Sequence, residues 1–266
     1  MLITGATGEI GKTISSVFTD RGVRLLPVAD LSEKKNYPTA PPKRLLHLAG
    51  RSDESRADSI IDSNIGYLTS IIQYAEQFGV EEFIFFSSVS VYGNQNKQDL
   101  SETDALAAPG LYGLSKLIGE KILENSGLNV LCLRLPGVLE IGKSTNFLSR
   151  TFVRLQKNEN ITVFNADNKF NNFIDIWNLA EFVAKLTVKK KFDVINLGNL
   201  NLLTLRDIIN LMRNALNSSS KIEYSDKYMP FFNLSIAKAV SYYDFNPGNA
   251  RDNIIRWCSQ RLAAEE

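Results

Sequence analysis

The chain has 266 residues, of which 44% are hydrophobic and 22% charged, and this length suits one α/β domain or a domain with a smaller appendage. Its 30 basic and 29 acidic residues leave a net charge of +1, so it lacks the strong positive field of a nucleic-acid-binding protein. No run approaches the roughly 20 apolar residues of a membrane helix, and we expect neither nucleic acid nor membrane as a partner.

The predicted elements alternate between strand and helix. In chain order they are a strand at 2–4, a helix at about 8–21, strands at 23–29 and 44–49, a long helix ending at Gly79, a strand at 82–88, a helix beginning near Tyr112 and a strand at 129–135. This alternation predicts parallel strands joined by crossover helices, and the nearly continuous apolar strands predict a sheet that is covered on both faces. Gly22, Gly79 and Gly127 each stand where a helical pattern stops, as left-handed caps do.

The pattern loosens after Arg134. A strand at 161–164, a helix at about 176–188, a strand at 193–199 and further helices near the C-terminus follow. We interpret this part as one more strand for the sheet and a small second lobe.

The two cysteines, Cys132 and Cys258, lie far apart and have no Cys or His at metal-ligand spacing, so we expect no metal site and no disulfide framework. The first strand-like residues follow Met1 directly, which leaves no room for a secretory segment. The predicted location is the reducing cytoplasm.

The stretch ITGATGEIG places Gly5, Gly8 and Gly11 after a strand and at the opening of a helix. Glycines there allow a tight turn and bring helix N-terminal amides to a pyrophosphate, although a merely structural turn would use them too. Asp30 lies 19 residues beyond Gly11, where a carboxylate would accept both ribose hydroxyls of NAD, unless it only caps a turn. Lys34 and Lys35 would instead meet a 2′-phosphate, so NAD is favoured and NADP stays possible.

Tyr112 and Lys116 lie four residues apart and therefore share one helix face. A cation about 4 Å from the phenol contributes roughly 4 kcal/mol at an effective dielectric of 20, so we expect Lys116 to lower the pKa of Tyr112. Such a tyrosine can donate a proton to a carbonyl oxygen as hydride moves at the adjoining carbon. The alternative is an exposed pair without function. Ser88 ends the strand at 82–88, where ligands collect, and would hydrogen-bond the same substrate oxygen.

With these pieces in place, the chain resembles the extended short-chain dehydrogenases/reductases, the family of NAD-dependent epimerases and dehydratases that act on nucleotide sugars. The motifs that carry the resemblance cover about the first 180 residues in the family's order: TGATGEIG, HLAG (47–50), SNIGYLTSI (63–71), SSVSVYG, YGLSK (112–116), LRLPGV (133–138) and FIDIWNLAE (173–181).

The resemblance implies a doubly wound parallel Rossmann sheet with a small C-terminal substrate-binding lobe. The dinucleotide-binding domain is predicted at 1–136 and 172–198, and the lobe at 137–171 and 199–266. Only residues 31–44 separate two predicted strands where the family usually fits another strand and helix, so we expect the usual third strand to be missing. A more open adenine end would follow, which favours a cofactor that dissociates.

The resemblance also assigns site residues. It implies Ser88, Tyr112 and Lys116 as a catalytic triad, whereas His47 is interpreted as a packed strand-end histidine. The implied cofactor-binding residues are Gly5, Thr7, Gly8, Glu9, Ile10, Gly11, Asp30, Leu48, Ala49, Gly50, Asn64, Ser87, Tyr112, Lys116 and Leu135. The implied substrate-binding residues are Ser88, Ser90, Tyr112, Gly137 and Asn171.

Two departures from the family pattern bear on the reaction. Val89 and Ser90 stand where dehydrating members carry Asp and Glu, so dehydration is disfavoured. Asn171 stands where the family has an Arg that clamps the substrate diphosphate, and the neighbouring His and second Asp align with Asp175 and Asn178. The replacements would be Arg150, Arg154 or Arg251, unless the substrate lacks a diphosphate.

The leading hypothesis is an NAD(P)-dependent reductase of the C4 ketone of a nucleotide-linked deoxysugar, of the kind used in polysaccharide biosynthesis. The alternatives are a nucleotide-sugar 4-epimerase that retains NAD and, from another class, a degenerate NAD(P)-sensing binding protein. The resemblance also implies a homodimer through the long helix and the YGLSK helix. The side chains that would form this contact, or else face the sheet, are Tyr67, Leu68, Ile71, Ile72, Leu117 and Ile118.

Overall fold

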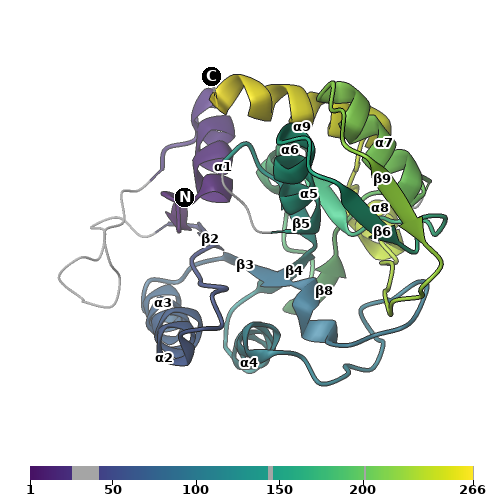
Figure 1. Cartoon of the computed structure of the whole chain (residues 1–266). Coiled ribbons are helices and arrows are strands. Elements are labelled where there is room, and N and C mark those ends of the chain that lie inside the picture. Colours follow the sequence, from purple (N-terminus) through teal and green to yellow (C-terminus); the bar gives the residue numbers. More distant parts are fainter. Residues whose placement is uncertain (26–41, 143–145, 201, 266) are drawn as a thin grey trace. The chain divides into compact units, whose positions relative to one another are not determined.

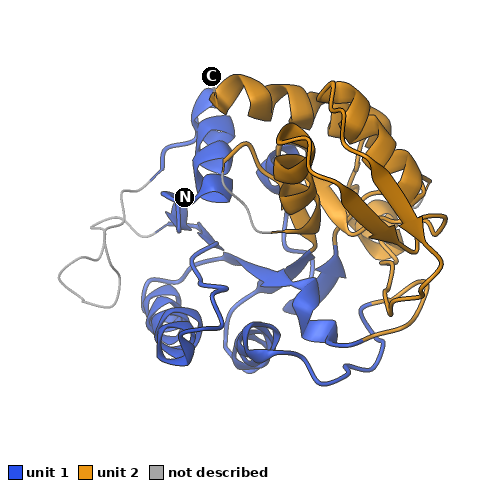
Figure 2. Ribbon diagram, viewed as in Figure 1, with its two compact units in different colours: residues 1–94, 102–135, 180–196 blue, residues 95–101, 136–179, 197–266 orange. Residues whose placement is uncertain are grey.

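A computed structural model describes residues 1–25, 42–142, 146–200 and 202–265. The chain divides into two compact units, shown in Figure 2: unit 1 comprises residues 1–94, 102–135 and 180–196, and unit 2 comprises residues 95–101, 136–179 and 197–266. Unit 2 thus includes residues 95–101 and 172–179, which the sequence had placed with the first domain. Asp30, Lys34, Lys35, most of the predicted strand at 23–29 and most of the short connection at 31–44 lie outside the described residues.

Unit 1 is built on a five-stranded parallel sheet of order β1-β2-β3-β4-β8. Its strands are β1 (Leu2–Thr4), β2 (Arg44–His47), β3 (Glu82–Ser88), β4 (Val130–Leu135) and β8 (Phe192–Asn196). Thr4 pairs with His47, and Ser88 pairs with Leu135. Because all strands run in one direction, their carboxyl ends meet at one edge of the sheet, where loops that bind ligands collect.

Helices cover both faces of this sheet. They are α1 (Glu9–Asp20), α2 (Ala57–Ile61), the π-helix η2 (Asp62–Gly66), α3 (Tyr67–Gln77), the 3₁₀ turn η3 (Val89–Tyr92) and α4 (Leu111–Glu124). In Figure 1, α1 lies over one face, and α2, α3 and α4 lie over the other. Glu181 of α6 (Ile176–Lys185) pairs with Arg21 at the end of α1, so the second half of α6 shares the face of α1. This doubly wound arrangement confirms the predicted fold class.

The core of unit 1 lies between the sheet and α3. Leu68, Ile71 and Ile72 on α3 are buried and belong to the cluster that includes Leu45 and Phe83 of the strands. The sequence left open whether these three side chains form a dimer contact or face the sheet. The structure places them against the sheet.

Two of the three predicted left-handed caps are confirmed. Gly22 and Gly79 have φ of 72° and 64°, which glycine adopts without a steric penalty. The prediction for Gly127 was wrong: this residue has no positive φ, because α4 already ends at Glu124 and Asn125 caps it.

Unit 2 contains two small parallel pairs, β5 with β7 and β6 with β9. Its elements are β5 (Gly137–Leu139), α5 (Phe147–Gln156), β6 (Ile161–Phe164), β7 (Phe173–Asp175), α7 (Leu205–Ala215), β9 (Ile222–Ser225), α8 (Ala237–Tyr243) and α9 (Ala250–Glu265). Phe152 and Trp257 centre its core, with ring centroids 5.4 Å apart. Among the described residues, no helix has both the length and the apolar character that crossing a bilayer requires.

Candidate active site

The glycine loop joins β1 to α1 at the carboxyl edge of the unit 1 sheet. Gly5 has a φ of 76°, and a Cβ there would lie 2.7 Å from the backbone nitrogen of Ala49. A Cβ on Gly11 would lie 2.1 Å from the carbonyl oxygen of Gly5. Gly8 is the N-cap of α1 and offers no capping side chain. No side chains at these three positions cover the backbone amides at the N-terminus of α1. This geometry fits the pyrophosphate of a dinucleotide.

The loop after β2 lies against the glycine loop and is held from the other side by Asn64. The side-chain amide of Asn64 donates to the carbonyl oxygen of Arg51 at 2.8 Å and to Oγ of Ser115 on α4 at 2.9 Å, and its Oδ1 accepts from the Arg51 amide at 2.7 Å. Asn64 lies in the π-helical turn η2, a distortion often found at functional sites. Its amide therefore orients the loop that carries Leu48, Ala49 and Gly50.

The three triad residues come from two adjoining elements. Ser88 ends β3 and is 8% exposed, and a hydrogen bond joins its side chain to the hydroxyl of Tyr112 in the first turn of α4. One turn later, Lys116 is 4% exposed and donates from Nζ to the carbonyl oxygen of Phe86 at 2.9 Å. A Cβ on Gly50 would lie 3.0 Å from this Nζ, so the amine borders the loop after β2.

The electrostatics differ from the sequence expectation. Burial raises the pKa of Tyr112 above its ordinary value, opposed by the hydrogen bond from Ser88, and Lys116 is not a cause of the shift. Burial also lowers the pKa of Lys116 to about 8, opposed by Cys132 and Glu120. The expected lowering of the tyrosine pKa by lysine was therefore wrong, because desolvation of the phenol outweighs the hydrogen bond with Ser88 and the cation does not contribute. Tyr112 is a protonated hydrogen-bond donor at neutral pH.

His47 is fully buried at the end of β2. Its Nδ1 shares a 2.8 Å hydrogen bond with Oγ1 of Thr4, and its ring stacks on Phe85 with centroids 5.9 Å apart. Burial, with a contribution from the charge of Lys116, lowers its pKa to about 3. The imidazole is therefore neutral and packed, as interpreted from the sequence.

Two acidic residues near the triad were missed by the sequence analysis. Glu120, one turn after Lys116, is 2% exposed and pairs with Arg134 of β4. Glu54 accepts a 2.8 Å hydrogen bond from the backbone amide of Tyr112. The signal for the first pair was an arginine within the otherwise apolar strand VLCLRL and a glutamate on the same helix face as Tyr112 and Lys116. Nothing in the local sequence pointed to Glu54.

The other predicted residues are placed as follows. The hydroxyl of Ser87 is buried and donates to Glu120 Oε1 of α4 at 2.5 Å. Ser90 is exposed and shares a 3.1 Å hydrogen bond with Ser88, and Leu135 ends β4 at the same sheet edge. Thr7, Glu9 and Ile10 belong to the glycine loop and the start of α1, with Glu9 paired to Lys12.

Gly137 and Asn171 lie in unit 2. Asn171 is 1% exposed; its amide donates to the carbonyl oxygen of Leu234 at 2.8 Å, and its Oδ1 accepts from the Leu234 amide at 3.0 Å. Both ends of this side chain are thus committed to the backbone, and we no longer assign Asn171 to substrate binding. Among the alternatives for the diphosphate, Arg154 pairs with Glu159, whereas Arg150 and Arg251 are exposed.

Unit 2 contains a cavity of about 320 Å³ beside β6. Its lining combines aromatic rings with amides and one cation: Phe147, Phe164, Phe170, Phe231, Asn165, Asn168 and Lys169. Asn165 binds both the amide and the carbonyl of Met229 and so holds the segment 229–231 along the cavity. Flat apolar walls with a few polar groups are typical of sites that bind a ring-shaped ligand.

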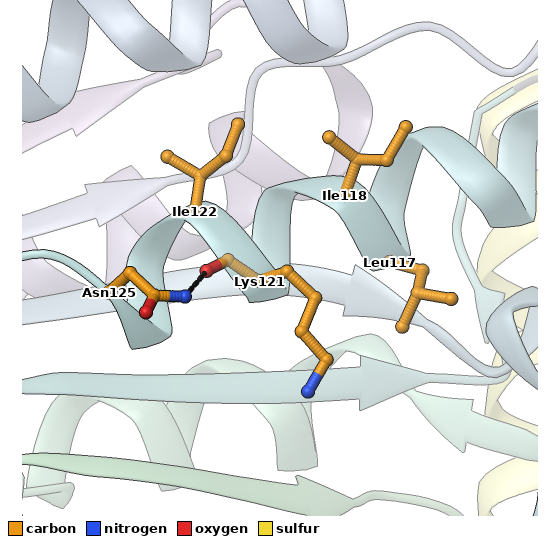
Figure 3. A pocket seen from close by; sticks show the side chains of 5 residues that line it. All are labelled: Leu117, Ile118, Lys121, Ile122 and Asn125. Carbon is orange, nitrogen blue, oxygen red and sulfur yellow. Dashed lines mark hydrogen bonds between the residues drawn. The ribbon is translucent and has the colours of Figure 1, made fainter.

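An apolar groove runs along the outer face of α4. It is lined by Leu117, Ile118, Lys121, Ile122 and Asn125, and Figure 3 shows Ile118 and Ile122 pointing to the same side of the helix. Leu114, one turn before Ile118, is 43% exposed. Leu117, Ile118 and Ile122 are partly exposed, unlike the buried α3 side chains, and Ile122 also packs against the core of unit 1.

Comparison with known proteins extends these observations. A family model described as the NAD dependent epimerase/dehydratase family matches residues 1–198. An uncharacterised protein of Methanocaldococcus jannaschii is 28% identical over 62% of this chain and 52% of its own length. An uncharacterised UDP-glucose epimerase of Bacillus subtilis is 21% identical over 68% of this chain and 61% of its own length. The matched regions thus span only about half to three-fifths of these two relatives.

A third relative, the dTDP-4-dehydrorhamnose reductase of Aggregatibacter actinomycetemcomitans, is 24% identical over 63% of this chain and 60% of its own length. Among solved structures, MoeE5 in complex with UDP-glucose and NAD has a TM-score of 0.80 at 18% identity and covers 100% of this chain and 99% of its own. RMD from Pseudomonas aeruginosa complexed with NADPH has a TM-score of 0.81 at 20% identity, with 98% of both chains covered. These likenesses show a shared fold.

Proposed function

The chain belongs to the NAD-dependent epimerase/dehydratase family, a family of enzymes, and we propose that it reduces the C4 ketone of a nucleotide-linked deoxysugar with NADH or NADPH. The observation that carries the proposal is the hydrogen bond between Ser88 and Tyr112 beside the buried Lys116. In support, the matching proteins include both UDP-sugar epimerases and a dTDP-4-dehydrorhamnose reductase, and the two solved structures described above are complexes with NAD or NADPH.

In this proposal the chain's own residues place and move one proton. Ser88 holds the substrate carbonyl oxygen against the phenol, and Tyr112 donates its proton to that oxygen. Lys116 is charged at neutral pH because its pKa is about 8, and it faces the loop that would border the nicotinamide ribose. When bound, the reduced nicotinamide supplies the hydride to the carbonyl carbon.

The Tyr112 hydroxyl is protonated at neutral pH, which is the state that a reductase needs at the start of its reaction. A reductase needs a phenol that starts protonated, whereas a 4-epimerase begins by oxidising an alcohol and therefore needs a phenolate that accepts a proton. Burial keeps the Tyr112 hydroxyl protonated at neutral pH. The 4-epimerase remains the second candidate because relatives of both kinds match the chain.

We also propose that the aromatic cavity of unit 2 holds the base of the sugar nucleotide. Phe164 is 37% exposed and lines the cavity together with Asn168, so a flat ring would find both a stacking surface and an amide partner there. Replacing Phe164 with Ala should raise KM for the sugar nucleotide while leaving the Kd for NADH unchanged.

The test uses purified protein with dTDP-, UDP-, GDP- and CDP-linked 4-keto-6-deoxysugars and either NADH or NADPH. The expected result is consumption of the reduced cofactor with at least one 4-keto sugar, and this result would also exclude the binding-protein alternative. Protein that purifies with stoichiometric NAD and interconverts C4 epimers of a UDP-sugar without added cofactor would contradict the proposal.

Tyr112→Phe keeps the ring and removes the proton that the proposal needs. We expect kcat to fall by about 10²- to 10⁴-fold with little change in the Kd for NADH. Tyr242→Phe, on the exposed helix α8, serves as the matched control and should behave as the parent does. Unchanged kcat in Tyr112→Phe would remove the catalytic assignment.

A further inference from the structure

Three residues spaced one turn apart on the buried face of α4 contact three consecutive residues of β3. Tyr112 is hydrogen-bonded to Ser88, and Lys116 donates to the carbonyl oxygen of Phe86 at 2.9 Å. The third is Glu120, whose Oε1 accepts from Ser87 Oγ at 2.5 Å. Only the first two belong to the triad, yet Glu120 continues the same row of contacts.

Glu120 also forms an ion pair with a side chain of the neighbouring strand β4. Arg134 of β4 donates from Nε to Oε1 at 3.0 Å and from Nη2 to Oε2 at 2.8 Å, and both side chains are at least 94% buried. The same guanidinium donates from Nη1 to the hydroxyl of Tyr92 at 3.1 Å. Tyr92 ends η3, the turn that begins directly after Ser88.

This network connects both elements that carry the triad. Glu120 lies on the helix of Tyr112 and Lys116, while Tyr92 lies on the turn that follows Ser88, and Arg134 bonds to both. Tyr92 in turn donates to Asn196 of β8 at 2.7 Å, which extends the network to a third strand. Stability alone does not account for such a pair, because apolar side chains of similar volume are often at least as stabilising in a core.

We propose that Glu120, clamped by Arg134, is a positioning residue for the triad: it fixes the register of α4 on β3 and places a negative charge on the face of α4 that carries Lys116. The inference rests on the proposed function, since it assigns to Glu120 the alignment of groups that act there. Both side chains are buried, so we assign them a positioning role and no contact with the substrate.

The groups that face Lys116 from neighbouring elements support the charge assignment. His47 of β2 is neutral because its pKa is about 3, and Tyr112 of α4 is neutral because burial raises its pKa. Cys132 of β4 and Glu120 both oppose the burial that lowers the lysine pKa. The pKa of the Cys132 thiol itself lies well above its ordinary value, because of burial first and then Glu120, so this thiol carries no charge at neutral pH. Glu120 is thus the member of this group that forms an ion pair, which it makes with Arg134.

The test combines two variants of the network with a matched control. Glu120→Gln keeps the shape and an acceptor but removes the charge. In the double variant Glu120→Met with Arg134→Met, two apolar side chains fill the core and no unpaired charge remains, so it should fold even where the single variant does not. Glu124→Gln removes an exposed carboxylate from the same helix and is the control.

The first readout is the titration of Lys116, followed by NMR of protein with labelled lysine and assigned by its loss in Lys116→Arg. We expect the midpoint to fall by about one pH unit in Glu120→Gln, to fall less in the double variant because that also removes the guanidinium, and to stay unchanged in Glu124→Gln. The sign follows from the charge, because removing a nearby carboxylate makes the ammonium form less favourable. This readout needs no substrate, so it decides the inference even if no sugar nucleotide is reduced.

The second readout is the kinetics of the active protein. We expect kcat to fall roughly ten- to a hundredfold at neutral pH, with a smaller change in KM, and the alkaline limb of the pH profile to move to lower pH. A folded double variant with parental kcat and a parental Lys116 midpoint would overturn the inference and leave the pair a purely structural one. Should both network variants fail to fold, Glu120→Asp keeps the carboxylate but shortens its reach to Arg134 and Ser87, and a parental kcat there would likewise overturn the inference.

Discussion

His47 illustrates how much a single buried side chain can couple stability to pH. It is the one histidine of the sequence, it is 0% exposed, and its ring lies between Thr4 and Phe85. Because burial lowers its pKa from 6.5 to about 3, the folded state binds a proton less readily than the unfolded chain does. The folded state with neutral His47 therefore keeps its full stability above pH 6.5. It loses stability relative to the unfolded chain as the pH falls toward 3.

We predict that this residue makes the protein acid-sensitive. The free energy of unfolding should fall by up to roughly 4 kcal/mol between about pH 6 and pH 3 on account of His47 alone. Urea unfolding across this range, compared with His47→Asn, isolates the contribution, since the carboxylates are common to both proteins. A His47 ring resonance that titrates near pH 6.5 in the folded protein would contradict the prediction.

Gly11 in the glycine loop has no room for a side chain, whereas Gly127 does. In Gly11→Ala the new Cβ would meet the Gly5 carbonyl oxygen at 2.1 Å, whereas around Gly127 no heavy atom lies within 4 Å of the added Cβ. We predict that Gly11→Ala destabilises the fold by about 1 to 3 kcal/mol and weakens NADH binding. Gly127→Ala should change neither. Thermal unfolding with and without NADH measures both effects, and parental NADH binding by Gly11→Ala would exclude the loop as the pyrophosphate site.

Among the elements, α4 depends on a cap that comes from a distant loop. Its N-cap residue, Gly110, has no side chain to accept a hydrogen bond from the first turn. Glu54, 58 residues before Tyr112, accepts from the Tyr112 amide at 2.8 Å instead. A carboxylate at a helix N-terminus also interacts favourably with the helix dipole.

We therefore predict that Glu54→Ala destabilises the protein by about 1 kcal/mol, the typical effect of losing an N-cap. Glu54→Gln retains an acceptor and should lose less. Glu124→Ala, at the opposite end of α4, is the control and should stay close to the parent in urea unfolding. Equal stability of Glu54→Ala and the parent would show that the cap contributes nothing.

At this scale the sequence predicted the elements of unit 1 well because their signals are local. Nearly continuous apolar runs, helical periodicity and the glycines at 22 and 79 are properties of neighbouring residues. The prediction of Gly127 as a cap failed because the cap of α4 lies two residues earlier. The backbone amide of Asn125 donates there to the carbonyl oxygen of Ile122 and so caps the helix. The sequence also did not predict the π-helical turn η2. In this turn Asn64 bonds to Arg51 and Ser115, which are distant in sequence.

For the whole molecule, we predict a homodimer that uses the groove on α4. Leu114, Ile118 and Ile122 form an apolar stripe on a surface helix, and such stripes on otherwise polar surfaces often mark interfaces. Ile118→Asp should convert a dimer to a monomer in light scattering coupled to gel filtration. Leu202→Glu, which is 68% exposed in unit 2, is the control. A parent protein that is monomeric at all concentrations would refute the interface.

The sequence by itself determined the parallel sheet, the glycine loop at its carboxyl edge and the positions of Tyr112 and Lys116 one turn apart on a helix, because each follows from spacing along a short stretch. Only the tertiary structure decided the protonation of Tyr112, since that depends on how deeply α4 packs against β3. It also decided that Asn171 is bonded to Leu234 and that Glu120 meets Arg134. Burial and ion pairing depend on residues brought together from distant parts of the chain, and no local pattern records which partner each side chain will find.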